Sequence, residues 1–123
     1  MNGVTFFLVL LLGGLVVFQV LLALGAPFGK AAWGGQHTSV LPRKLRVASA
    51  ISVVLLLCII SVVLSFTGIV TLYPNAVALG ILWVSAVYFG VGVVMNAISR
   101  SRIERVWSPY SAVICILMIS LIL

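Results

Sequence analysis

Residues 47–66 read VASAISVVLLLCIISVVLSF, an unbroken apolar run without a charged side chain. A helix needs about 20 residues to cross about 30 Å of hydrocarbon, because each residue advances it by about 1.5 Å. Lipid offers the backbone no hydrogen-bond partners, so a run this long and continuous must be helical. Strands of a membrane barrel would show short alternating stretches, and the sequence has none. The run therefore predicts a membrane-spanning helix.

Three further apolar runs lie at residues 4–24, 76–95 and 106–123. We expect a single all-α domain over residues 1–123, a membrane-spanning four-helix bundle with helices at about 4–24, 45–68, 75–97 and 102–123. Gly25 and Pro27 are expected to end the first helix, and Asn75 is expected to cap the third. The first run is expected to be a retained helix, since no basic residue precedes it and it exceeds the length of a signal core.

The start of the fourth helix has two interpretations. A start at Ser108 and Pro109 leaves a helix of only about 22 Å. Ser101 followed three residues later by Glu104 has the form of a capping box. A helix from there to the last residue would be about 34 Å long, with Pro109 as a kink near the membrane surface. We favour the longer, kinked helix.

The composition fits lipid surroundings. The chain is 64% hydrophobic and only 7% charged, against about 25% charged residues in a soluble domain. Seven Lys and Arg residues against one acidic residue give a net charge of +6. These cations lie beside apolar runs, so the expected polyanion is the phospholipid headgroup layer rather than nucleic acid.

The positive charges predict an orientation. All seven lie in two segments, one between helices one and two and the other between helices three and four. Successive spans alternate in direction, so both segments face one side, and their charge assigns that side to the cytoplasm. We therefore expect both termini outside, in a bacterial plasma (inner) membrane. Such a bias should allow insertion in one orientation only, so any homo-oligomer should be parallel.

The segment 25–37, GAPFGKAAWGGQH, carries candidate binding groups. One interpretation is a surface-lying loop, anchored by the cations and by Trp33 in the interfacial aromatic belt. The other is a pocket in which the amides of residues 34–35, Gln36 and His37 face an anionic headgroup or a small anion. The candidate headgroup-binding residues of the whole chain are Lys30, Trp33, Gln36, His37, Arg43, Lys44, Arg46, Asn96, Arg100, Arg102 and Arg105.

Three further features concern packing. Glu104, the only acidic side chain, can pair with Arg100, complete the capping box, or reach Arg43 or Arg46. We expect it to hold the two basic segments together. Gln19 is expected to bond a serine or a carbonyl of a neighbouring helix. The small-residue face of helix three is expected to form an intramolecular seam, with a dimer interface as the alternative; it comprises Ala76, Gly80, Trp83, Val87, Gly90, Val94 and Ala97.

No catalytic constellation is visible. The four apolar runs contain no acidic, basic or histidine side chain, whereas ion-coupled pumps place such groups at mid-membrane. One Glu and one His do not supply the paired groups that hydrolysis or phosphoryl transfer needs. Cys58 and Cys115 lie inside apolar runs and are expected to act as small hydrophobes. We therefore expect no enzyme activity, no cofactor and no metal site.

The two polar segments resemble those of small bacterial four-helix membrane proteins of unassigned function. The resemblance rests on AAWGGQH at 31–37, LP at 41–42, LR at 45–46, and Asn96, SRS at 99–101, Glu104-Arg105, Trp107 and Pro109. It implies a bacterial inner membrane and a pairing of the two segments, and it implies no activity. The sequence thus favours a structural or accessory protein whose basic face binds anionic lipid or a membrane partner. The alternative is an oligomeric channel or transporter for a small neutral or anionic solute.

Overall fold

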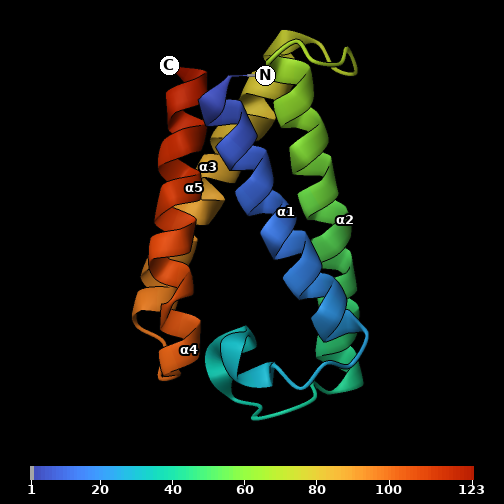
Figure 1. The fold of residues 1–123 in the computed structure, drawn as a ribbon, viewed down its shortest axis with the longest axis vertical. Helices are drawn as coiled ribbons and strands as arrows, with labels where there is room; N and C mark the ends of the chain where they lie inside the picture. The colour runs from blue at the N-terminus through green and yellow to red at the C-terminus, as the bar shows by residue number, and fades with distance from the viewer. Residues whose placement is uncertain (1) are drawn as a thin grey trace.

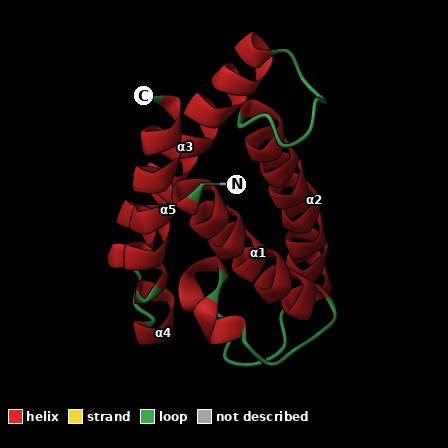
Figure 2. Cartoon of the chain, turned by 45° about the horizontal axis from the view of Figure 1, so that its top comes forward, coloured by secondary structure: helices red, strands yellow, loops and turns green. Residues whose placement is uncertain are grey.

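The computed structural model describes residues 2–123. Its regular elements in that part of the chain are all helices, joined by loops, and none is a strand (Figure 2). The elements are α1 (Gly3–Ala23), η1 (Gly29–Ala31), η2 (Trp33–Gly35), α2 (Arg43–Phe66), α3 (Asn75–Ala97), α4 (Arg102–Arg105) and α5 (Trp107–Ile122). Four helices are long and apolar enough to cross a membrane, the fourth being the stretch Arg102–Ile122. The prediction of an all-helical chain with four candidate spans is confirmed.

Two helices end at glycines in the left-handed conformation. At the end of α1, Gly25 has φ +97°, and the amide of Ala26 donates to the carbonyl of Leu21 at 2.9 Å. At the end of α2, Gly68 has φ +82°, and Ile69 donates to Leu64 at 3.0 Å. Both are Schellman motifs, which satisfy carbonyls that the helix leaves unpaired. Gly68 therefore ends α2 at Phe66, two residues before the predicted end at 68.

Two further boundaries bear on the sequence predictions. Asn75 is the first residue of α3 rather than its cap, because Pro74 takes the non-helical conformation that precedes the helix. The favoured longer form of the last span is confirmed, since it runs over Arg102–Ile122 with an interruption at Val106, between α4 and α5. Pro109 is the third residue of α5 and cannot bond the carbonyl four residues before it, that of Arg105 at the end of α4. The interruption thus lies where the missing N–H of Pro109 acts.

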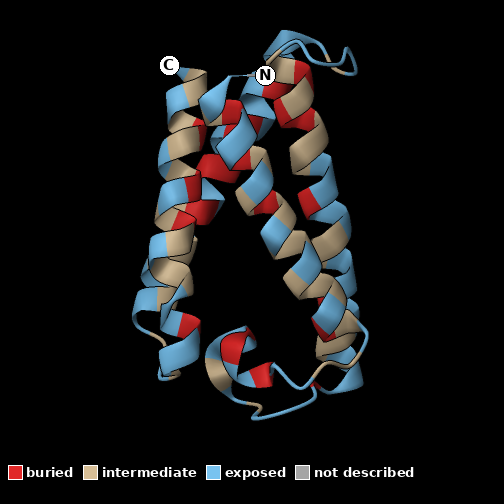
Figure 3. Cartoon of the chain, viewed as in Figure 1, coloured by how far each residue is buried: buried red, intermediate tan, exposed pale blue. Residues whose placement is uncertain are grey.

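The helices form two pairs. α3 packs most extensively against α5, and α1 against α2. The pairs approach each other at the end that carries both termini and diverge toward the other end, where η1 and η2 lie between them (Figure 1). The main cluster of buried apolar side chains lies in the half nearer the termini (Figure 3); its members include Leu8, Leu12, Val63, Leu82, Ile114 and Met118.

Most of the helical surface faces outward. Of the 18 residues that form the apolar stretch of each span, only 17–28% are buried inside the protein. The prediction of a seam on α3 is wrong: of the small-residue face, only Gly90 is half-buried, and the other six residues are exposed. The packed face consists of Ala78, Leu82, Ser85, Ala86 and Phe89. α3 carries apolar side chains on every face, and lipid accepts an apolar face as readily as the protein core does. The sequence therefore does not indicate which face packs.

Candidate functional site

The segment between α1 and α2 folds into a plug between the two helix pairs. The amide of Gly29 donates to the carbonyl of Ser39 at 2.7 Å, which closes the segment on itself. Trp33 has a positive φ of 52°, and its indole N–H donates to the buried Ser49 hydroxyl of α2 at 3.0 Å. Such a φ is rare outside glycine and persists only where surrounding contacts hold it. The plug is thereby attached to the α1–α2 pair.

Three hydrogen bonds attach the same plug to the start of the last span. The Ser101 hydroxyl donates to the carbonyl of Lys30. The amide of Gly34 donates to the Glu104 carboxylate at 2.8 Å, and the indole N–H of Trp107 donates to the carbonyl of Ala31 at 2.9 Å. Glu104 is 6% exposed. The two basic segments, far apart in the sequence, therefore form one structure, called here the basic end.

Glu104 joins the two segments through a backbone amide rather than through an arginine. Only half of the capping box forms: Ser101 Oγ accepts from the amide of Glu104 at 3.4 Å, while the carboxylate turns to Gly34. A backbone N–H group donates a hydrogen bond to the buried carboxylate, as an arginine would, but it does not require a second buried charge. No pattern in the sequence indicates that the Gly34 amide is the partner of Glu104.

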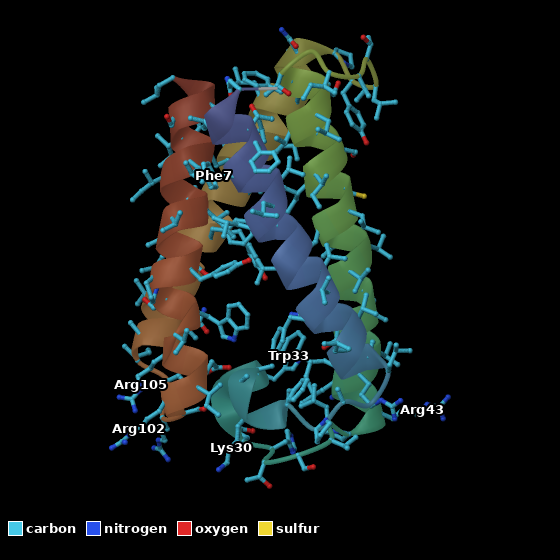
Figure 4. The ribbon with its side chains drawn as sticks, in the orientation of Figure 1. Phe7, Lys30, Trp33, Arg43, Arg102 and Arg105 are labelled. Atoms are coloured by element: carbon cyan, nitrogen blue, oxygen red, sulfur yellow. The ribbon has the colours of Figure 1, made fainter. Side chains whose placement is uncertain are left out.

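The cations surround the plug on the outside. Lys30, Arg43, Arg102 and Arg105 project outward from the basic end, whereas Phe7 lies in the opposite half of the molecule (Figure 4). Lys44 and Arg100 are also exposed. Arg46 differs, because it is half-buried and its Nε donates to the carbonyl of Ala23 at 3.1 Å. Six cations are thus available to a ligand, and the seventh braces α1 against α2.

The two glycine amides of the hypothetical anion pocket in the plug are already bonded. Gly34 N–H is bonded to Glu104, and Gly35 N–H donates to the carbonyl of Ala32 at 3.0 Å. Gln36 is exposed and His37 half-buried. The protein's own carboxylate therefore occupies the position in which the pocket hypothesis placed an external anion.

A cavity of about 770 Å³ lies between the helix pairs. Its lining comes from every element of the chain. Aromatic rings contribute much of it, among them Phe18, Trp33, Tyr88, Phe89 and Trp107. Polar groups of the lining include Gln19, Ser52, Ser85, Asn96, Glu104 and Ser111. On α3 the lining extends from residue 80 to residue 96, about 24 Å along the helix.

The cavity opens sideways between α2 and α3. Apart from Trp33, the exposed lining residues all belong to these two helices. Leu55 on α2 is 58% exposed, and Val84 and Tyr88 on α3 are 71% and 65% exposed. The lining residues of α1 and α5 are half-buried or buried. Since α2 and α3 are both candidate spans, this opening would face lipid rather than water.

Two polar residues that the sequence singled out line this cavity. Gln19 was expected to bond a neighbouring helix, but its Oε1 is buried without a hydrogen-bond partner. Asn96, a candidate headgroup-binding residue, donates from Nδ2 to the carbonyl of Gly92 in its own helix at 2.9 Å. The sequence carries no signal for the divergence of the helix pairs.

Between residues 2 and 123, no group of three or more His, Cys, Asp or Glu side chains gathers into a metal-binding arrangement. Comparison of the chain with protein-family models, with curated proteins and with solved structures finds no match.

Proposed function

We propose that this protein is an accessory membrane protein whose basic end binds anionic headgroups of the cytoplasmic leaflet. The observation that carries the proposal is the joining of the two basic segments by three hydrogen bonds. Each Lys or Arg near an anionic surface contributes about 1 kcal/mol. Six exposed cations on one structure would therefore hold that end firmly at an anionic surface.

The same charges support the orientation. The described ends of the chain and the turn between α2 and α3 carry no Lys or Arg, and they lie opposite the basic end (Figure 1). The positive-inside rule then places the basic end in the cytoplasm and both termini outside a bacterial inner membrane. A parallel homo-oligomer or another membrane protein remains the proposed partner beside the lipid.

Lipid retention tests the proposal. The triple variant R100Q/R102Q/R105Q should lose most of the preference of the protein for phosphatidylglycerol over phosphatidylcholine, measured by native mass spectrometry from mixed nanodiscs. The matched variant R100K/R102K/R105K keeps the charge and should retain the preference, because headgroup attraction of this kind depends on charge. A wild-type protein that retains both lipids equally would contradict the proposal.

The cavity favours a second candidate, a channel or transporter. Its lining includes no Lys or Arg and one carboxylate, so a path through it suits a neutral solute better than an anion. Four helices that expose most of their surface scarcely enclose a pore, so this function requires an oligomer. A strictly monomeric protein in native-like lipid, measured by mass photometry, would eliminate it.

A further inference from the structure

The charged side chain that lines the cavity is negative, whereas the charged side chains exposed on the basic end are positive. Of the eight charged side chains of the sequence, only Glu104 lines the cavity. It is almost fully buried, and the surrounding lining is mainly apolar and aromatic. A buried carboxylate in such surroundings interacts more strongly with a nearby charge than it would in water. It also opposes any second negative charge. An anionic ligand of the basic end is therefore a poor ligand of the cavity.

Four hydrogen-bond donors of the lining are used within the protein. The indole N–H groups of Trp33 and Trp107 donate to Ser49 and to the carbonyl of Ala31. The hydroxyls of Ser52 and Ser85 donate to carbonyls of their own helices, at 3.0 and 2.8 Å. These four groups consequently present acceptors or ring faces to the cavity, not donors.

One charged acceptor remains available in the lining. Glu104 uses one carboxylate oxygen for Gly34, and a carboxylate accepts several hydrogen bonds. The cavity thus complements a ligand that donates hydrogen bonds and carries positive charge.

The aromatic rings add a second attraction for cations. Phe18 and Trp107 lie with ring centroids 4.8 Å apart, and both line the cavity. The N–H edge of Trp107 is bonded to the plug, so the part of Trp107 that lines the cavity offers a cation aromatic carbon rather than an N–H donor. A cation over an aromatic face gains about 0.5–2 kcal/mol, most where water is excluded.

We propose that the cavity binds a lipophilic amine, with its ammonium group at Glu104 and its apolar part along α2 and α3. An ammonium offers three donors and no acceptor, which matches the carboxylate oxygen that Glu104 does not use for Gly34. Ligand pockets are usually about 300–1,000 Å³, so 770 Å³ suits one such molecule. The ligand would reach the site from the lipid, through the opening between α2 and α3. The site shares Glu104 with the basic end but takes a ligand of opposite charge.

Three probes of equal chain length test the head group: dodecylammonium, dodecanol and dodecanoate. Binding is followed by tryptophan fluorescence in a W83F background, because Trp83 lies outside the lining and the other two tryptophans line the cavity. The protein is held in phosphatidylcholine nanodiscs at about 0.15 M salt, which screens the exposed cations beyond about 8 Å. Empty nanodiscs correct for partition of each probe.

Dodecylammonium is expected to bind at least tenfold more tightly than dodecanol, and dodecanoate most weakly. The variant E104Q should abolish the preference for the ammonium, while its amide oxygen still accepts from Gly34 and keeps the plug in place. Dodecanoate binding as tightly as dodecylammonium, or an unchanged preference in E104Q, would overturn the proposal.

A steric variant tests the place of binding. A side chain at Gly80 finds open space and Gly80 lines the cavity, whereas Gly13 is equally open but lies outside the lining. The variant G80L should weaken all three probes at least threefold relative to G13L, since it fills part of the volume. Equal affinities in the two variants would place the probes elsewhere and overturn the proposal.

Discussion

Replacing Gly14 by alanine is expected to lower the melting temperature in detergent, whereas replacing Gly13 is expected to leave it unchanged or raise it. The Tyr110 hydroxyl of α5 donates to the carbonyl of Leu11 in α1, directly beside Gly14. A Cβ atom at Gly14 would collide with the Tyr110 hydroxyl oxygen, but one at Gly13 would meet nothing within 4 Å. Alanine favours a helix over glycine by about 1 kcal/mol. Overpacking costs about 1–3 kcal/mol and therefore outweighs that gain only at Gly14.

The tyrosine cannot simply move aside. Its ring stacks edge-on against Trp107, with centroids 5.1 Å apart, and Trp107 is itself bonded to the plug. Removing the hydroxyl should relieve the collision, because the ring carbon that carries it would lie 3.7 Å from the new Cβ, an ordinary contact. G14A should thus be neutral or stabilising in a Y110F background. A double-mutant cycle by thermal unfolding measures this coupling, and additive effects of the two changes would contradict the geometry.

The four spans could be predicted because their signal is local. Hydrocarbon thickness fixes the length of a span, and the predicted third helix, 75–97, has the bounds of α3. Errors elsewhere came from single residues: Gly68 ends α2 early through its positive φ, and Pro74 takes the position before α3 that was expected for Asn75. Such details depend on a few torsions, which composition does not determine.

The arrangement of the spans could not be predicted. In a soluble protein, polar residues mark the outer face of a helix. Here lipid accepts apolar residues on every face, so the exposed face of α3 looked as suitable for packing as the buried one. The divergence of the two helix pairs, and with it the cavity, follows from which faces pack. Gln19 and Glu104 were both conspicuous in the sequence, but nothing there indicated that they line one space.

The joining of the basic segments was only partly predictable. A single carboxylate among seven cations indicated that Glu104 was structural. Its partner is the amide of Gly34, 70 positions away, and an amide is present at almost every residue. Charge counting therefore favoured an arginine partner. The informative feature was the Gly34-Gly35 pair, because both residues adopt a positive φ at the contact with Ser101 and Glu104.

Alanine at Gly35 is expected to separate the plug from α4, whereas alanine at Gly34 is not. Both glycines have positive φ, +69° and +82°, so both substitutions incur a similar strain of about 1–2 kcal/mol. They differ in space: a Cβ at Gly35 would collide with the Ser101 side chain and lie 3.2 Å from the carbonyl of Lys30, whereas the nearest atom at Gly34 is 3.9 Å away. G35A should thus lower the melting temperature by several degrees more than G34A, measured by thermal unfolding in detergent. In an S101G background, which lacks the colliding atoms, G35A should cost less stability than it does in the wild type, although S101G itself loses the hydrogen bond to Lys30.

The same pair of variants separates the stability of the basic end from its affinity for lipid. If six exposed cations act as one surface, G35A should also lower the phosphatidylglycerol preference in native mass spectrometry, because the α4 arginines would no longer be held beside the plug. G34A keeps the amide that Glu104 accepts and should keep the preference. A G35A protein that melts earlier yet retains phosphatidylglycerol like the wild type would show that the two segments bind lipid separately. In that case the hydrogen bonds to Glu104 and Ser101 would serve folding alone, and net charge alone would determine lipid binding.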